Sequence, residues 1–172
     1  TIEQMAFQHY FVRDRCQPTV TGFSFEGMDS ARPSDKFLAA LESKNLGSIL
    51  ICPSNPFVSV DPVLKLPGIL EAMKKSLAPV IAVSPIVGGQ AIKGPAAKMM
   101  AELGMPASAL AVAKHYQGRI DGFVIDEADA DLKEEIQGLG IPTIVTKSVM
   151  VTLEDRISLA EAVLEFADEL AS

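Results

Sequence analysis

The 172-residue sequence has no tryptophan, two cysteines and two histidines, and these shortages exclude several classes of protein. Cys16 and Cys52 lie too far apart for a CxxC metal knuckle, and one such pair makes no disulfide framework. We therefore expect a reducing compartment, the cytoplasm. No apolar run approaches the roughly 18 residues of a membrane-spanning helix, so we expect no membrane partner.

Positive charge is also scarce, because 15 lysines and arginines face 22 aspartates and glutamates, which gives a formal net charge of −7. Sequence-independent binding of nucleic acid depends on basic side chains at phosphates, so we expect no nucleic-acid partner. The shortage of positive charge does not exclude a small anionic ligand that binds in one local pocket. The hydrophobic content of 48% indicates either a large parallel-sheet core or a face that another chain covers.

Short apolar runs alternate with helical stretches from Asn45 onward. Four runs are brief, rich in β-branched residues and bounded by turn formers: 48–52, 79–83, 120–125 and 142–146. Near-continuous apolarity is typical of strands that are covered on both faces. The runs therefore predict the buried strands of one parallel sheet.

Helices are expected between and around these strands. The candidate segments carry N-cap serines, initial prolines or terminal glycines, and they are 34–45, 67–77, 95–104, 108–118, 130–140 and 153–170. Alternation of strand and helix implies right-handed crossovers. We therefore predict the α/β class, as a three-layer α/β/α fold with a mainly parallel sheet, in a single domain spanning 1–172.

The first part of the chain has a different pattern from the rest. Residues 1–28 have little core of their own and are predicted to be peripheral to an α/β core at 29–172. Residues 2–14 favour a helix and residues 19–27 favour a strand. We expect this helix-strand segment to pack across the α/β part or against another chain.

The loop after the first predicted strand reads PSNP, and it contains Ser54 and Asn55 between two prolines. Ligands of open parallel sheets bind beyond the carboxyl ends of the strands, which is where this loop lies. Its hydroxyl, amide and backbone N–H groups suit an oxyanion. An Asx-type turn that ends the strand is the alternative interpretation.

The loop after the second strand lies within AVSPIVGGQAIKGPA, residues 82–96. Ser84 ends the strand, Gly88 and Gly89 allow the backbone to curl, and Lys93 precedes a helix that starts near Pro95. Glycines, a cation and a helix start together are typical of a phosphate-binding loop, although neither GxxxxGK[ST] nor GxGxxG is present. A glycine-rich βα loop with a solvated lysine is the alternative.

The third strand is followed by DEADAD, in which Asp126 stands where the strand meets the expected crevice. Carboxylates at this position suit Mg²⁺ or a guanine edge, whereas the other acids are interpreted as helix-capping residues. Lys147 follows the fourth strand, and a lysine at this position is typical of phospho-receiver domains. The loops after the other strands lack the phospho-accepting aspartate that such a domain needs. His9 and His115 have no local acid partner and are interpreted as surface or packing residues.

Taken together, these stretches resemble the 2-phospho-L-lactate transferases that build the deazaflavin coenzyme F-420. The resemblance is carried by ICPSNPFVSVDPVLKLPGILEAMKKSLAPVIAVSPIVGGQAIKGPAAKMMAELG, by HYQGRIDGFVIDEAD and TKSVM, and by FQHYFVRDRCQP and FEGMDSARPS. It implies transfer of a phospho-lactyl-type group from a guanosine diphosphate-linked donor to a deazaflavin acceptor, with Mg²⁺ assisting and GMP leaving. It also implies nucleotide or phosphate contacts for the following residues: Ser54, Asn55, Ser84, Gly88, Gly89, Lys93 and Asp126.

This sequence departs from the family in one respect. Family members are nearly twice as long, and they begin with a glycine-rich GGTGG-like loop and metal-handling acids that this sequence lacks. The resemblance therefore implies the carboxyl-terminal half of a transferase, with catalytic residues and Mg²⁺ ligands outside this chain. We expect a homo-oligomer or association with the missing amino-terminal half. A nucleotide or nucleotide-sugar binding regulatory module of the same superfamily is the alternative function.

Overall fold

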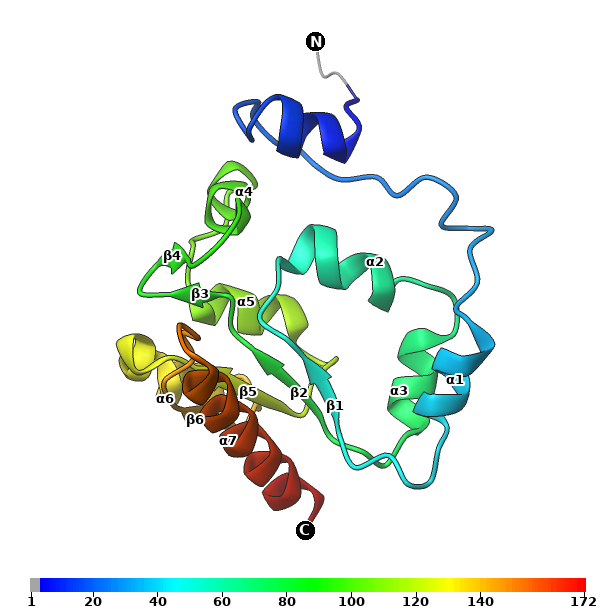
Figure 1. The fold of residues 1–172 in the computed structure, drawn as a ribbon, viewed down its shortest axis with the longest axis vertical. Coiled ribbons are helices and arrows are strands. Elements are labelled where there is room, and N and C mark those ends of the chain that lie inside the picture. Colours follow the sequence, from blue (N-terminus) through cyan, green and yellow to red (C-terminus); the bar gives the residue numbers. More distant parts are fainter. Residues whose placement is uncertain (1–3) are drawn as a thin grey trace.

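A four-stranded parallel sheet forms the centre of the computed structural model, which describes residues 4–172 (Figure 1). The strands lie in the order β1 (Ile49–Ile51), β2 (Val80–Val83), β5 (Gly122–Ile125) and β6 (Thr143–Val145). Each lies inside one of the four predicted runs, so the prediction of a parallel sheet is confirmed. Because all four strands run the same way, their carboxyl ends share one edge of the sheet.

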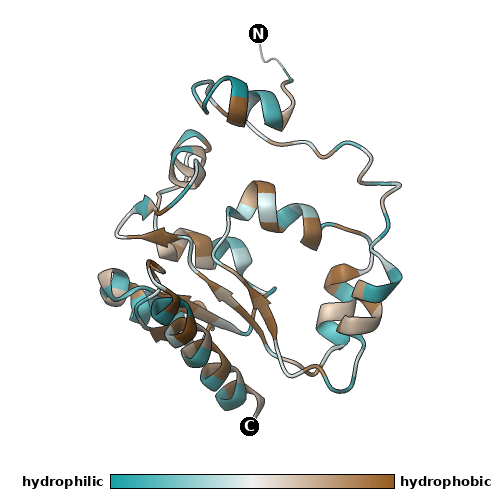
Figure 2. Cartoon of the chain, viewed as in Figure 1, coloured by the Kyte–Doolittle hydropathy of each residue, from teal (hydrophilic) through white to brown (hydrophobic). Residues whose placement is uncertain are grey.

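Helices cover both faces of the sheet, which confirms the predicted α/β class. On one face, Ile81, Val83 and Val124 pack against α7 (Leu153–Ala171) through Leu159, Val163 and Phe166. On the other face, the alternate residues of β2 and β5 join a larger core with residues of α3 (Ile69–Lys75), α4 (Ala96–Glu102) and α5 (Ala109–Tyr116). Figure 2 shows the hydrophobic strands at the centre and α7 with mixed hydrophilic and hydrophobic residues.

Several helix starts follow the sequence signals directly. Ser34 accepts a hydrogen bond from the Phe37 N–H at the start of α1 (Asp35–Leu41), and Ser108 accepts one from the Ala111 N–H at the start of α5. Thr152 and Asp155 form a reciprocal capping box at the start of α7. The predicted helix at 130–140 is divided into the 3₁₀ helix η3 (Glu127–Leu132) and α6 (Lys133–Gln137).

Two features of the loops were not predicted. The chain after β1 forms the π-helix η2 (Pro56–Val60), which continues into α2 (Asp61–Leu64). The glycine loop after β2 forms an antiparallel hairpin from β3 (Ile86–Val87) and β4 (Gln90–Ala91). Both lie after strand ends, so both shape the carboxyl edge of the sheet.

The predicted strand at 19–27 is wrong, because residues 19–25 run without strand pairing and a turn follows. A strand needs a neighbour for its N–H and C=O groups, and this segment instead makes single contacts. The Val20 N–H donates to Glu102 Oε2 (3.0 Å), and Phe23 stacks on Phe57 at 5.5 Å between ring centroids. Earlier in the chain lies a π-helix, η1 (His9–Arg13), whose Tyr10 is buried in the main core. Residues 4–28 therefore pack across the α/β part, which is one of the two arrangements expected for them.

Among residues 4–172, no helix is long and apolar enough to cross a membrane. Cys16 and Cys52 are both free thiols.

Gly122 gives a test of the packing between β5 and α7. A Cβ atom there would lie 2.7 Å from Phe166 Cε1 and 2.8 Å from Leu170 Cδ1. We expect Gly122→Ala to lower the free energy of unfolding by about 1–3 kcal/mol in urea denaturation, because the core has no room for the methyl group.

The matched control is Gly47→Ala, because a Cβ atom there meets nothing within 4 Å. The double variant Gly122→Ala/Phe166→Leu should lose less stability than the two single variants summed, since the smaller side chain relieves the overlap. Additive losses, or a Gly122→Ala variant as stable as the Gly47→Ala variant, would show that this packing is described wrongly.

Candidate functional site

The carboxyl edge of the sheet brings together the loops that the sequence analysis singled out. Ser54 and Asn55 follow β1, Ser84 follows β2, and Asp126 follows β5. The β3–β4 hairpin and the exposed segment that carries Lys93 extend from the same end of β2. Parallel strands present their carboxyl-end loops at one crevice, which makes this edge the candidate site.

In the loop after β1, Asn55 has a structural role. Its Oδ1 accepts hydrogen bonds from the N–H groups of Phe57 (3.0 Å) and Val58 (3.4 Å), which caps η2. This is the Asx-type geometry that the sequence analysis gave as the alternative. Ser54 is half-buried beside it. The loop therefore combines a residue that fixes its shape with a half-buried serine.

The loop after β2 is built around the Gly88–Gly89 turn. Both glycines have positive φ, 56° and 77°, and they join β3 to β4 as a two-residue turn. Two positive φ angles in succession characterise the type I′ hairpin turn, for which glycine is well suited. The buried Ser84 hydroxyl donates to the Ile86 carbonyl (2.8 Å) and accepts from the Ile86 N–H (3.2 Å). Ser84 therefore holds the base of the hairpin.

Asp129, on η3, holds the tip of the same hairpin. Its carboxylate accepts the Gly88 N–H at 3.0 Å and 3.2 Å from its two oxygens. Burial raises the pKa of Asp129, as do the neighbouring carboxylates of Asp126 and Asp131, while the Gly88 N–H works in the opposite direction. A carboxylate thus already accepts one of the N–H groups that we expected to face a phosphate. Sequence alone indicates only a helix-capping role for Asp129, because the residue that it binds lies 41 positions earlier.

Asp126 is engaged in a similar way with the chain after β6. Its Oδ2 accepts from the N–H (2.7 Å) and hydroxyl (3.0 Å) of Ser148, and its Oδ1 accepts from the Ala128 N–H (3.0 Å). Burial opposes ionisation of Asp126, but these hydrogen bonds outweigh it and lower the pKa. Both oxygens are therefore committed to fixing loops.

The two lysines near this edge differ in their surroundings. Lys93 lies on an exposed segment between the hairpin and α4. Lys147 pairs with Asp155 at 2.6 Å, and this pairing lowers the pKa of Asp155 while Asp155 raises that of Lys147. Since Asp155 belongs to the α7 capping box, Lys147 supports a helix start.

The acids at this edge do not fit a resident Mg²⁺ ion. Within residues 4–172, no group of three or more His, Cys, Asp or Glu side chains is arranged to hold a metal. The oxygens of Asp126 and Asp129 accept protein hydrogen bonds instead. Mg²⁺ coordination requires oxygen ligands that are available to the ion.

A second polar cluster lies between α2 and α5. His115 has a partner after all, because its Nε2 lies 3.0 Å from Oδ1 of the buried Asp61, a residue 54 positions earlier. Burial opposes ionisation of Asp61, but His115 and Lys65 outweigh it and lower the pKa. His115 also packs edge-on against Phe57 at 5.4 Å between ring centroids. The Asp61–His115 pair connects α2 to α5. Because the two residues lie far apart in the sequence, local sequence patterns do not predict this pair.

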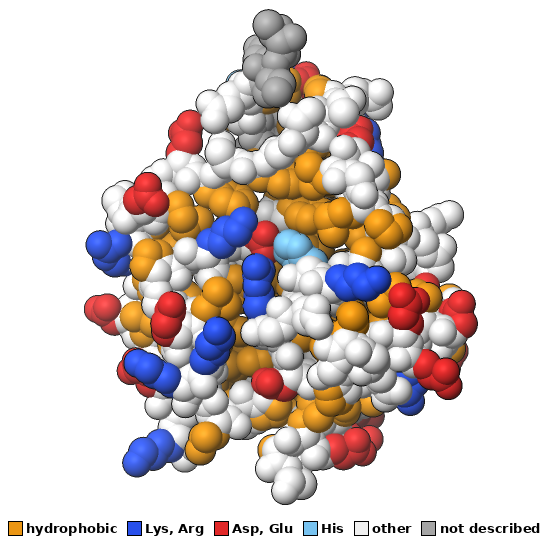
Figure 3. Space-filling model, turned by 180° about the vertical axis from the view of Figure 1, so that it is seen from behind, with side chains coloured by type: hydrophobic (Ala, Val, Ile, Leu, Met, Phe, Trp, Pro, Cys, Tyr) orange, Lys and Arg blue, Asp and Glu red, His pale blue; other side chains and the backbone are white. Residues whose placement is uncertain are grey.

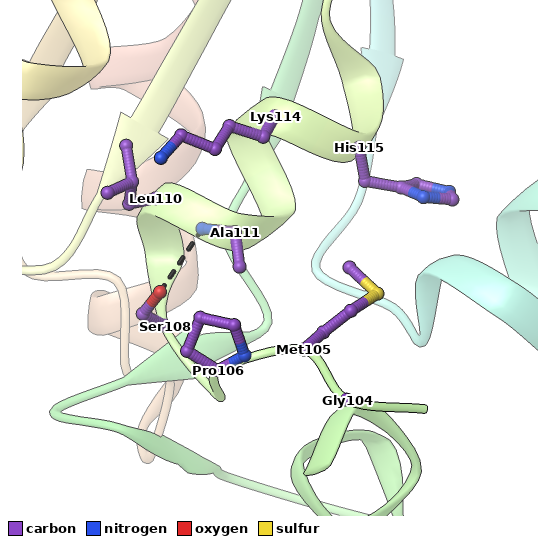
Figure 4. Close-up of a pocket in the computed structure, with 8 residues that line it drawn as sticks. All are labelled: Gly104, Met105, Pro106, Ser108, Leu110, Ala111, Lys114 and His115. Atoms are coloured by element: carbon purple, nitrogen blue, oxygen red, sulfur yellow. Dashed lines mark hydrogen bonds between the residues drawn. The ribbon is translucent and has the colours of Figure 1, made fainter. Parts of the chain in front are cut away.

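A cavity of about 380 Å³ lies beside this cluster, along the α4–α5 loop and α5. Figure 4 shows that Lys114 and His115 point away from each other there and that Ser108 bonds to Ala111. The space-filling view shows hydrophobic side chains gathered on this side around a histidine, with lysines or arginines at the rim (Figure 3). The polar groups do not converge on one point, so the carboxyl edge remains the stronger candidate.

Comparisons with known proteins agree with the resemblance seen in the sequence. The family model for "2-phospho-L-lactate transferase CofD" matches residues 2–161. A 2-phospho-L-lactate transferase of Methanosarcina mazei is 38% identical over 94% of this chain and 52% of its own length. A phosphoenolpyruvate transferase of Streptomyces griseus is 35% identical over 95% of this chain and 51% of its own length.

A third relative, a 2-phospho-L-lactate transferase of Methanocaldococcus jannaschii, is 32% identical over 98% of this chain and 52% of its own length. The chain spans about half the length of the curated relatives it matches. Within that span, the family model covers almost every described element, from η1 into α7. The chain therefore belongs to the 2-phospho-L-lactate transferase (CofD) family.

Proposed function

We propose that this chain supplies the nucleotide- and phosphate-binding part of a cytoplasmic transferase in coenzyme F-420 biosynthesis. The transferase would move a phospho-lactyl or phosphoenolpyruvyl group from a guanosine diphosphate-linked donor to a deazaflavin acceptor and release GMP. The observation that carries the proposal is the family match over residues 2–161, which includes every loop at the carboxyl edge.

The chemistry of phosphoryl transfer fits a site without a protein nucleophile. Such reactions depend on holding phosphates in place and neutralising their charge. In this proposal the Gly89 backbone, the Ser54 hydroxyl and the Lys93 ammonium bind the donor's phosphates. All three belong to loops at the carboxyl edge, and Gly89 and Lys93 are exposed.

The remaining site residues act by shaping these loops. Asn55 caps η2, Ser84 holds the hairpin base, and Asp126 fixes the chain that follows β6. Gly88 supplies the positive φ that the turn requires. The proposal places the Mg²⁺ ligands outside this chain, as the family resemblance implies, and it is supported by the engagement of Asp126 and Asp129 in hydrogen bonds within the protein.

We further propose that the open edge of β1 pairs with the half of the transferase that this chain does not match. Leu50 lies beside Ile81 in the sheet, yet Leu50 is 41% exposed whereas Ile81 is fully buried beneath α7. An apolar strand at an open edge is a template for a further strand. In this proposal, the additional residues of the longer relatives provide the strand that pairs with β1.

One prediction from this proposal concerns the glycine turn. We expect Gly88→Val to weaken GDP binding roughly tenfold or more in calorimetric titration, because valine at φ 56° is strained and distorts the hairpin. Lys93→Ala should weaken binding by no more than about fivefold, since one exposed charge contributes up to ~1 kcal/mol. GDP should bind more tightly than a UDP-sugar, and the reverse order would favour the regulatory module.

The control for Gly88→Val is Gly27→Val, which places the same strain at φ 74° in a turn near the N-terminus. Circular dichroism checks that each variant folds. If Gly88→Val folds and binds GDP as the unaltered chain does, the hairpin is not a phosphate site and its glycines serve the turn alone.

Another prediction from this proposal concerns the open edge of β1. The chain alone should release no GMP from a guanylylated donor with deazaflavin and Mg²⁺. Coexpression with the unmatched half of the Methanosarcina mazei relative should give a complex that copurifies and turns over. Leu50→Lys should abolish copurification, because lysine on an edge strand opposes pairing.

Leu77→Lys is the matched control, since Leu77 is fully exposed in the loop between α3 and β2 and belongs to no strand. Turnover by the chain alone, or equal copurification of both lysine variants, would contradict the proposed pairing. Concentration-dependent self-association that Leu50→Lys removes would point instead to a second copy at the same edge.

A further inference from the structure

Asp129 is a buried carboxylate at the candidate site to which the proposed function assigns no role. It is 5% exposed on η3, directly after β5, and it reaches across to the hairpin that follows β2. Burying a carboxylate is costly unless hydrogen bonds compensate for the lost water. Here the compensation includes the Gly88 N–H, which lies within 3.2 Å of both oxygens.

The position of this hydrogen bond matters for the neighbouring glycine. In a two-residue hairpin turn, the ladder does not use the N–H groups of the central residues, which remain available to other acceptors. Asp129 takes the N–H of Gly88, while Gly89 is exposed at the tip. A Cβ atom on Gly89 would lie 3.6 Å from the Ala107 carbonyl oxygen, so the tip also contacts the α4–α5 loop. The hydrogen bond from the Gly88 N–H to Asp129 therefore sets the orientation of the hairpin tip, including that of Gly89.

We propose that Asp129 is a positioning residue, whose carboxylate holds the Gly88–Gly89 turn in the orientation that presents the Gly89 backbone to the donor's phosphates. This inference rests on the proposed function, because it assigns the phosphate contact to the same hairpin. Asp129 acts through Gly88 and does not touch the substrate.

The charges around Asp129 separate positioning from fold stability. The charged groups that face it are the carboxylates of Asp126 and Asp131, which raise its pKa together with burial. A carboxyl whose pKa is raised by folding makes the folded state less stable once it ionises, and stability returns as the pH falls through that pKa. Replacing Asp129 by asparagine should thus leave the thermal midpoint unchanged or raised while loosening the turn.

The test compares Asp129→Asn and Asp129→Ala with the control Asp131→Asn, which removes an exposed charge from the same element. We expect GDP affinity to fall modestly in Asp129→Asn, which keeps a neutral acceptor, and roughly tenfold in Asp129→Ala, which keeps none. Asp131→Asn should bind GDP as the unaltered chain does.

A second readout does not depend on nucleotide. In NMR spectra of the unaltered chain, the Gly88 amide proton should shift as the pH falls through a midpoint above the ordinary aspartate value of 3.8, and this titration should vanish in Asp129→Asn. If the chain binds no GDP but the amide titrates, the proposed function fails and the hold on Gly88 stands. A Gly88 amide that does not titrate, or GDP affinity that rises in both Asp129 variants, would overturn the positioning role.

Discussion

The carboxyl edge of this protein depends on the acidic segment that follows β5. Because β5 lies between β2 and β6 in the sheet, its loop can reach the loops of both neighbours. Asp126 binds the Ser148 N–H and hydroxyl on the β6 side, and Asp129 binds the Gly88 N–H on the β2 side. Two buried carboxylates thus join three loops, and charge-assisted hydrogen bonds of this kind are stronger than neutral ones.

The same arrangement explains why some residues of the site are buried and hold the loops, whereas others are exposed. Side chains that the sequence pattern suggested as ligands, such as Ser84 and Asp126, are buried and committed to neighbouring backbone. Among the exposed groups, Gly89 lies on the hairpin whose base Ser84 holds, and Lys93 lies on the exposed segment that follows the hairpin. Backbone N–H groups on a rigid loop suit phosphate well, since little freedom is lost on binding.

The sequence predicted the central fold well because its signals are local. Continuous apolar runs marked all four strands, and Ser34 and Ser108 marked helix starts through their own hydroxyls. The hairpin was missed although Gly-Gly between short apolar segments is a known signal for a type I′ turn. The same glycines also suit a phosphate loop, and local pattern alone does not choose between these interpretations. Local sequence patterns could not predict the pairing of Asp61 with His115, because 54 residues separate the two partners.

The most direct test of the account is a map of backbone amide shifts in the chain on addition of GDP. If the hairpin binds the donor's phosphates, the changes will centre on residues 54–55 and 84–94, with smaller changes at Asp129 through its hydrogen bond to Gly88. Changes confined to the cavity along residues 104–115, with the hairpin unaffected, would contradict it.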